Sequence, residues 1–425
     1  MARLLIRNGR VISPEDGLDG QMDLLIVDGE IHEIAPHLSG PKYETMDASG
    51  QIVAPGFVDI HVHLREPGGE ISETLETGLR AAVAGGFTSV CPMPNTRPVN
   101  DNAEVTRRLV HRAEALKLAR VFPIAAVTVG SQGKQLTDFG ALRAAGAVGF
   151  SDDGKPVRTR TLMKKALQKA KVLGAPIIDH CEVPGLSAGG VMNEGVHSKS
   201  LGLQGIPNGA EDDCIARDIE VVEATGGYLH VAHLSTAGGI RMVRDAKSRG
   251  LQVTCEVTPH HFTLTDEAIT RYGTNAKMNP PLRKPADVEA LLAAMQEGVV
   301  DAIATDHAPH AVELKLRPMA EAPFGVTGLE TALALGLRQL VHSGRIPLSQ
   351  FIALMSSRPA RIINKPLGRI RVGGAADLTL FDPELDWTYL AAGGCSKSHN
   401  SPFDGWKFRG AVTATIVRGR VAFRR

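Results

Sequence analysis

Two histidines, His61 and His63, stand two residues apart in the apolar run 57–64. Side chains two apart in a strand point the same way, with about 6.5 Å between their backbones. Two imidazoles at this spacing can converge on one metal ion. Asp59 is in register with them, and Arg65 follows two residues after His63. These neighbours favour a metal site over a pair of hydrogen-bonded core histidines.

Strand-like apolar runs alternate with helix-like stretches eight times along the chain, and the stretches 161–174 and 285–295 are examples of the helical pattern. Eight such units over roughly 300 residues predict an α/β fold, a (β/α)8 barrel of the TIM type, whose chemistry lies where the strands end. The strands are predicted to end at His61/His63, Pro94-Asn95, Val129, Asp153, His180, His233, His260 and Asp306. We therefore expect one constellation of polar groups, made of His61, His63, Asp153, His180, His233 and Asp306.

The two ends of the chain are predicted to form a second, smaller domain. Alternating strand patterns occupy 4–12 and 23–34, with a hairpin signal at Asp28-Gly29, and short β segments occupy 376–381 and 411–423. Neither end has enough strands to bury a face alone. We predict that they pack into one β-sandwich, with a discontinuous domain of residues 1–53 and 366–425 flanking a barrel of residues 54–365.

Composition narrows the class of protein. Apolar residues make up 43% of the chain and charged residues 22%, which are ordinary globular values. The formal net charge is +1 and there is no basic run, which argues against a nucleic-acid partner. Five dispersed cysteines predict reduced core residues instead of a disulfide framework. With no apolar span long enough for a membrane and no secretory pattern at the N-terminus, a cytoplasmic location is expected.

The motifs together resemble those of the class I dihydroorotases of the amidohydrolase superfamily, over essentially the whole chain. The first motif alone is shared with allantoinases and loosely with hydantoinases, so the combination is what is specific. The resemblance is carried by the segments 59–68 (Asp-Ile-His-Val-His-Leu-Arg-Glu-Pro-Gly), 93–96 with Pro98, 149–154, 279–283, 305–310 and 323–325, and by His180 and His233 at strand ends.

The resemblance implies reversible cyclisation of N-carbamoyl-L-aspartate to L-dihydroorotate with loss of water, a step of pyrimidine synthesis. It implies zinc as the cofactor, one or two ions per chain. His61, His63 and Asp306 would hold the first ion, His180 and His233 the second, and Asp153 would bridge them where many relatives carry a carbamylated lysine. Such a metal lowers the pKa of bound water to about 7. Asp306 is expected to act as general base and then general acid, and its alternative role is that of a ligand only.

A free carboxylate on the substrate calls for a fork-shaped cation, and Arg65 lies just past the metal pair. The resemblance adds Asn95 and His310 to the carboxylate site, Asn279 to the pyrimidine ring, and backbone groups around Pro323 and Gly325. His260, His261 and His307 are expected to be structural neighbours, and Asp152 to face away from the site. Residues 311–322, which have few apolar anchors, are predicted to form a mobile flap.

Two other functions stay open. One is another cyclic amidohydrolase, an allantoinase or a dihydropyrimidinase (hydantoinase), against which Asp153 and the 93–96 motif argue. The other is a non-catalytic scaffold for aspartate transcarbamoylase, against which the complete set of metal-ligand candidates argues. The predicted partners are the small-molecule substrate, a second copy in a homodimer, and a complex with aspartate transcarbamoylase, with neither nucleic acid nor membrane among them.

Overall fold

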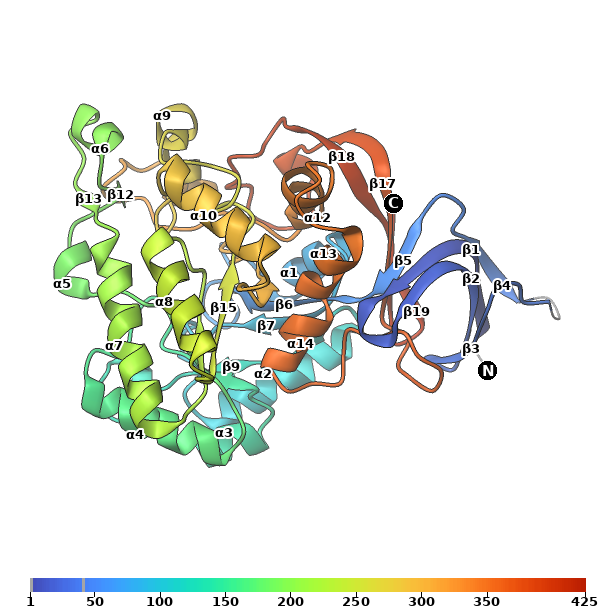
Figure 1. The fold of residues 1–425 in the computed structure, drawn as a ribbon, viewed down its shortest axis with the longest axis horizontal. Helices are drawn as coiled ribbons and strands as arrows, with labels where there is room; N and C mark the ends of the chain where they lie inside the picture. The colour runs from blue at the N-terminus through green and yellow to red at the C-terminus, as the bar shows by residue number, and fades with distance from the viewer. Residues whose placement is uncertain (1–2, 40–42) are drawn as a thin grey trace.

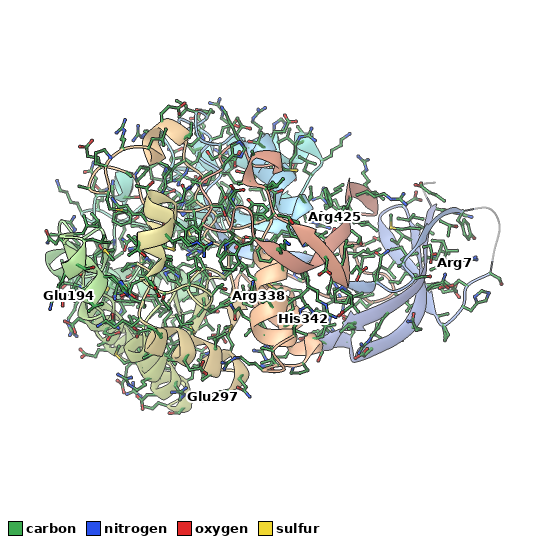
Figure 2. The ribbon with its side chains drawn as sticks, turned by 90° about the horizontal axis from the view of Figure 1, so that it is seen from above. Arg7, Glu194, Glu297, Arg338, His342 and Arg425 are labelled. Carbon is green, nitrogen blue, oxygen red and sulfur yellow. The ribbon has the colours of Figure 1, made fainter. Side chains whose placement is uncertain are left out.

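The computed structural model describes residues 3–39 and 43–425. Figure 1 shows an elongated molecule, in which helices surround short strands at one end and a twisted sheet built from both chain termini stands at the other. Figure 2 shows the same arrangement from above, with Arg7 in the sheet at one end and Glu194 at the opposite end. The two parts of the molecule are therefore built from different strand patterns.

The larger part is built on parallel strands. Their sheets have the orders β6-β7-β8 and β9-β10-β11-β14-β15-β16. Phe122 N, directly after β8, donates to Val90 O in β7, and a parallel bridge joins Val62 at the end of β6 to His307 after β16. The bridge thus connects β6 of the first sheet with the loop that follows β16 of the second. The bounds are β6 Phe57–Val62, β7 Phe87–Pro92, β8 Arg120–Val121, β9 Ile124–Ala125, β10 Gly149–Phe150, β11 Ile177–Asp179, β14 Leu229–Val231, β15 Val253–Val257 and β16 Ala302–Ile303.

Helices follow most of these strands and cover their outer side (Figure 1). Several begin at a side-chain cap that accepts a backbone N–H, which satisfies donors that the first turn leaves free. Thr74 caps α1, Asn102 caps α2, Thr159 caps α4 and Thr236 caps α8. The bounds are α1 Leu75–Ala84, α2 Ala103–Leu116, α3 Phe139–Ala144, α4 Arg160–Val172, α7 Gly209–Thr225, α8 Ala237–Ser248, α10 Pro285–Gln296, α12 Ala332–Gly336, α13 Leu348–Met355 and α14 Ser357–Ile362.

Shorter elements lie in the loops between these units. One excursion between β11 and α7 carries a two-stranded parallel pair at the end of the molecule where Glu194 lies (Figure 2). The buried Arg283 guanidinium donates to Asn193 Oδ1 and to the Ile206 carbonyl, which holds this excursion against the following loop. The elements are α5 Pro184–Ser187, β12 Met192–Asn193, α6 Val196–Ser200, β13 Gly205–Ile206, α9 Ala268–Tyr272, α11 Val312–Lys315, the 3-10 turns η1 Pro14–Asp16, η2 Val129–Ser131, η3 Gly273–Ala276 and η5 Ala391–Gly393, and the π-helix η4 Leu337–Val341.

Within the described residues, the two ends of the chain form one eight-stranded sheet of order β19-β18-β17-β5-β1-β2-β3, with β4 beside β1. β5 joins the termini, because it is parallel to β1 and antiparallel to β17. Buried apolar side chains from both ends form one cluster on this sheet. The bounds are β1 Arg3–Ser13, β2 Leu18–Val27, β3 Glu30–Ala35, β4 Glu44–Asp47, β5 Ile52–Pro55, β17 Leu378–Thr388, β18 Lys407–Val417 and β19 Arg420–Arg424.

The sequence predictions of element type agree with the structure, and their bounds differ. The structure confirms the mixed α/β content, the helices near 161–174 and 285–295, and the association of the two termini. Most of the parallel strands end two or three residues before the polar residue that was predicted to end them; β16, for instance, stops at Ile303 and leaves Asp306 in a loop. The termini share one hydrogen-bonded sheet where a sandwich was expected. No described helix combines the length and apolarity needed to cross a membrane.

Candidate active site

His61 and His63 are held by acceptors on one side of each ring. His61 Nδ1 donates to Glu256 Oε1 at 2.6 Å, and His63 Nδ1 donates to Asn95 Oδ1 at 2.9 Å. A ring nitrogen that donates in this way leaves the other nitrogen with a free lone pair, which is how proteins orient metal-binding histidines. Both Nε2 atoms therefore face the same space, and both rings are buried.

Two carboxylates occupy that space. Asp306 Oδ1 lies 3.0 Å from His63 Nε2 and 3.6 Å from His61 Nε2, and Asp153 Oδ1 lies 3.4 Å from His61 Nε2. The ligand atoms of His61, His63 and Asp306 all lie within 4.8 Å of one another, and so do those of His61, Asp153 and His233. The structure therefore brings together five of the six residues that the sequence predicted as metal ligands.

His180, the sixth predicted ligand, lies beside His233. Its Nδ1 is 2.9 Å from His233 Nε2 and 3.9 Å from Asp153 Oδ1. Its Nε2 lies 3.7 Å from Glu182 Oε2. His180 and His233 thus lie together near Asp153, as the two-ion interpretation requires, although the tightest group around Asp153 contains His61 and His233.

The charges of the cluster support one another. Burial raises the pKa of Asp153 and of Asp306, but hydrogen bonds and charges of the surrounding histidines outweigh it, so both carboxyls stay ionised below their usual range. Burial likewise opposes ionisation of Glu256, yet His61 and His230 lower its pKa to about 2. The cluster is therefore a set of ionised carboxylates among imidazoles.

Three residues of the site have backbones in the left-handed region that non-glycine residues rarely adopt. The φ angle is 59° at Arg65, 31° at His233 and 46° at Asp306. Such conformations cost about 1–3 kcal/mol each and cluster at functional sites. The loops after β6, β14 and β16 therefore hold these side chains at an energetic cost, which indicates selection for the position of the side chain.

The cluster opens into a cavity of about 210 Å³. This volume is small compared with the usual 300–1,000 Å³ of drug-sized ligand pockets, so it suits a compact substrate. Among its lining residues, Arg65 is the only permanent cation. A larger cavity of about 790 Å³ lies between α2 and the β18–β19 turn and contains none of the candidate residues. The lining of the smaller cavity is His63, Arg65, Asn95, Asp153, Gly154, His180, His233, Asn279, Asp306, Ala308, His310, Phe324 and Gly325.

Arg65 and His310 meet on one wall of this cavity. Arg65 Nε donates to the Pro309 carbonyl at 3.1 Å, and its Nη2 lies 3.2 Å from His310 Nε2. Burial and the Arg65 charge lower the pKa of His310 to about 2, so its ring is neutral. Its Nε2 also lies 2.7 Å from the Phe324 carbonyl, to which it donates. Arg65 Nη2 then keeps a hydrogen free for a ligand.

Asn95 and Asn279 both line the cavity, and each hydrogen-bonds to different residues of the site. Asn95 accepts from His63 and donates to Asp153 Oδ2 at 3.1 Å, so it positions two candidate ligands. Asn279 Nδ2 donates to Glu182 Oε2 at 2.8 Å, while its Oδ1 is buried without a hydrogen-bond partner. An orphaned buried acceptor at a cavity wall is available to a donor on a ligand.

The segment 311–325 is tied down by two buried lysines. Lys315 Nζ donates to the carbonyls of Pro323 and Gly325 at 2.9 and 3.0 Å. Lys277 Nζ donates to the carbonyls of Met319 and Ala322. Of the two residues predicted here, Gly325 lines the cavity and Pro323 does not. Phe324 lines the cavity instead of Pro323. These contacts count against the mobile flap that the sequence suggested, because the segment has polar anchors that its apolar content does not show.

Comparison with known proteins places the chain in a family. Residues 50–238 match the family model described as Dihydro-orotase-like. The chain is 49% identical over 421 residues to a protein named dihydroorotase from Geobacter sp. (strain M21), with 99% of each chain covered. It is 50% identical over 420 residues to a protein of that name from Pelotomaculum thermopropionicum, covering 99% of this chain and 98% of the other. The chain belongs to the dihydroorotase family.

Solved structures show the same fold at greater distance from this dihydroorotase-family chain. The L-hydantoinase (dihydropyrimidinase) of Arthrobacter aurescens superposes with a TM-score of 0.88 at 26% identity, covering 99% of this chain and 96% of the other. The D-hydantoinase (dihydropyrimidinase) of Thermus sp. gives 0.82 at 27% identity, covering 99% and 95%. The family membership rests on the relatives near 49% identity, and these structures confirm the amidohydrolase architecture.

A divalent metal fits the residues at this site. His61 Nε2 is buried without a hydrogen-bond partner and faces two ionised carboxylates. A buried lone pair without a donor costs free energy unless something occupies it. Imidazole nitrogens with carboxylate oxygens are the donor set of catalytic divalent metals. The residues of this dihydroorotase-family site can therefore hold a metal ion.

Sequence reasoning missed Glu256 and placed several other residues correctly. Glu256 contacts His61 and His230, and its Oε1 accepts from the His233 backbone N–H. The only signal for it in the sequence was a lone carboxylate inside the apolar run 253–257.

Asp152 faces away from the site and accepts from Thr128, and His307 contacts Glu73. His261 bonds the Pro280 carbonyl, whereas the buried His260 Nε2 has no hydrogen-bond partner. Asp59 accepts from Thr305 and from the His61 backbone, which ties β6 to the loop after β16.

Proposed function

We propose that the chain catalyses the reversible ring closure of N-carbamoyl-L-aspartate to L-dihydroorotate, with loss of water, in pyrimidine synthesis. The observation that carries this proposal is one compact cavity that joins a cluster of imidazoles and carboxylates to a single permanent cation, Arg65. Opening or closing a cyclic amide needs a polarised carbonyl and a proton carrier, and a substrate with a free carboxylate needs a fixed cation.

Arg65 is the group that binds the substrate carboxylate. Although burial lowers its pKa to about 10, the guanidinium remains charged at neutral pH, and Nη2 keeps a free donor because the neutral His310 bonds Phe324 O. Asn279 Oδ1 supplies an acceptor for an amide N–H of the ring. A ligand held at these two points would present its reacting carbonyl to the cluster between them.

Asp306 carries the proton. Its carboxylate stays ionised because the neighbouring imidazoles, of which His63 Nε2 lies 3.0 Å from Oδ1, lower its pKa. In the ring-opening direction it accepts the proton of the attacking water and returns it to the departing nitrogen. His61, His63, Asp153 and Asp306, with His180 and His233, would hold zinc, one or two ions per chain. When bound, zinc supplies Lewis acidity toward the carbonyl and the water.

The remaining proposals concern architecture and assembly. We infer that the parallel strands close into one (β/α)8 barrel at residues 54–365, supported by the bridge between Val62 and His307. We also infer a terminal domain of residues 1–53 and 366–425, supported by the shared sheet and apolar cluster, although β5 runs on to Pro55. A cytoplasmic location, a homodimer and a complex with aspartate transcarbamoylase stay predictions.

The test is turnover of L-dihydroorotate by the purified, zinc-loaded protein, with allantoin and dihydrouracil assayed in parallel. We expect selective ring opening of dihydroorotate, because only this substrate presents a carboxylate to Arg65. Preference for dihydrouracil or allantoin would overturn the assigned substrate while leaving the metal cluster in place. Inactivity toward all three compounds, with metal bound, would favour the scaffold function instead.

A further inference from the structure

A second group of potential metal ligands lies outside the candidate active site. It consists of Asp179 and Cys181 on and just after β11, and Cys214 and Asp218 on α7. Their four ligand atoms lie within 4.8 Å of one another, and every one of these residues is at most 3% exposed. The group is thus closed on all sides, and the dihydroorotase reaction does not use it.

The sulfur–oxygen distances within this group are close to those of a tetrahedral metal site. Cys181 Sγ lies 3.9 Å from Asp179 Oδ2 and 3.9 Å from Asp218 Oδ2. Cys214 Sγ lies 3.8 and 3.7 Å from the same two oxygens. Zinc bonds of about 2.3 Å to sulfur and about 2.0–2.2 Å to oxygen give tetrahedral sulfur–oxygen edges of about 3.5–3.7 Å. A contraction of a few tenths of an ångström would close the four atoms on one ion.

Directed hydrogen bonds do not explain this arrangement. A thiol has one hydrogen and can donate to one carboxylate at a time, yet each sulfur lies almost equally far from both carboxylates. Two neighbouring buried carboxylates also repel each other. A cation between the four groups would remove this repulsion.

Arg217 supplies part of the compensating charge from the edge of the group. Its guanidinium lies 2.7 Å from Asp218 Oδ1, 3.2 Å from Cys214 Sγ and 3.8 Å from Asp179 Oδ2. One guanidinium balances one of the two carboxylates and leaves the other without a counter-charge, while the two cysteines are neutral thiols. Binding of one divalent ion would release the two thiol protons, and the four ligands, Arg217 and the ion would then carry a net charge of −1.

From these observations we propose that Asp179, Cys181, Cys214 and Asp218 bind a structural zinc ion that joins β11 to α7. Two thiolates favour zinc over the hard cations, which prefer oxygen ligands alone. Four protein ligands without an open position are the mark of a structural site, in contrast to a catalytic one. The ion would also hold His180 in place, because His180 stands between Asp179 and Cys181 in the chain.

Cobalt(II) is the probe that tests this site. A thiolate bound to cobalt gives an intense near-ultraviolet charge-transfer band, which imidazole and carboxylate ligands do not give. The full-length protein would be reduced, stripped of metal and titrated with Co²⁺ alone, with metal content measured in parallel. We expect the band to appear with one equivalent of cobalt in addition to the metal of the histidine cluster.

Cysteine variants identify the ligands. Cys181→Ser and Cys214→Ser should each abolish the band and reduce bound cobalt by one equivalent, since serine is a poor ligand for this ion. Cys255→Ser is the matched control, because Cys255 is a buried cysteine of β15 that belongs to neither ligand group and whose sulfur hydrogen-bonds to the Val299 carbonyl. It should keep the band. Dihydroorotate turnover is measured on the same samples but does not decide the outcome.

Two results would overturn the proposal. The first is a reduced wild-type protein that shows no thiolate-to-cobalt band at saturating cobalt, which needs no variant to fold. The second is a band that Cys181→Ser removes and Cys214→Ser retains, because that pattern would assign Cys181 to the histidine cluster. Since either result can occur with full or absent dihydroorotase activity, failure of this proposal is distinguishable from failure of the proposed function.

Discussion

Strand β11 separates two clusters of ligand-forming residues that differ in what surrounds them. His180 faces the histidine and carboxylate cluster, which opens into a cavity of about 210 Å³. Asp179 and Cys181, its neighbours on either side, face Cys214 and Asp218 on α7 and are closed off. Alternation of side chains along an extended segment produces both environments from three consecutive residues.

The cations of the two clusters differ in the same way. Arg65 lines the cavity and keeps a donor free, whereas Arg217 directs its guanidinium into Asp218, Asp179 and Cys214. Chemistry on a substrate requires an open position and an uncommitted charge, and a structural site requires neither. Disruption of the open cluster should therefore lower activity, whereas disruption of the closed cluster should lower metal content and stability.

The largest expected effect is that of Asp306→Asn. The variant removes the carboxylate that we propose as proton carrier, so kcat for dihydroorotate should fall about 10²–10⁴-fold. Steady-state turnover with measured metal content checks this, because a kcat loss at full metal content separates proton transfer from metal binding. Asp152→Asn is the matched control, since Asp152 faces Thr128 on the other side of the strand. A kcat within a few-fold of wild type in Asp306→Asn would contradict the role.

Arg65→Met should weaken substrate binding. A hydrogen bond to a charged group contributes about 1.5–3 kcal/mol, so KM for dihydroorotate should rise about 10–100-fold with a smaller change in kcat. Arg217→Met provides the comparison, because its guanidinium belongs to the closed cluster and should leave KM unchanged. Equal changes of KM in the two variants would remove the distinction between the two cations.

Glu256→Gln should weaken metal binding without removing a contact to the substrate. The carboxylate orients His61 and raises its basicity, and loss of such a partner typically costs about 10–100-fold in metal affinity or activity. Competition of the protein with a chelator measures the affinity directly. Excess zinc should restore much of the lost activity in Glu256→Gln but not in Asp306→Asn. Unchanged metal affinity would show that Glu256 serves packing alone.

Much of the open cluster could be predicted from the sequence, because its residues are positioned by features that are local in the chain. His61 and His63 share a face because of strand alternation, and polar residues that follow apolar strands gather at one end of a parallel sheet. Glu256 could not be assigned in the same way. Its contact with His61 depends on how β15 lies across from β6, which no local spacing encodes.

The closed cluster could not be predicted from the sequence for a similar reason. Cys181 and Cys214 were interpreted as separate core cysteines, and only the packing of α7 on β11 brings them to the same carboxylates. The segment 311–325 shows the same limit. Its apolar content suggests mobility, while its anchors are two lysines whose partners are backbone carbonyls, and backbone partners leave no trace in the sequence.

The smallest expected effect concerns Lys315, which anchors the wall of the open cavity. Burial and the nearby Lys277 lower its pKa from 10.5 to about 7. The unfolded chain therefore holds a proton between pH 7 and 10.5 that the folded chain has released, so stability from this group rises with pH across that window. In Lys315→Met the titrating amino group is absent, so this pH dependence should be lost. The thermal midpoint of the wild type, relative to the variant at the same pH, should increase from pH 7 to 10 and stay level below about pH 6. Lys277→Met should show a weaker dependence, because the pKa of Lys277 is less depressed. A difference that is constant from pH 6 to 10 would mean that Lys315 keeps its proton and acts on the loop as a permanent cation.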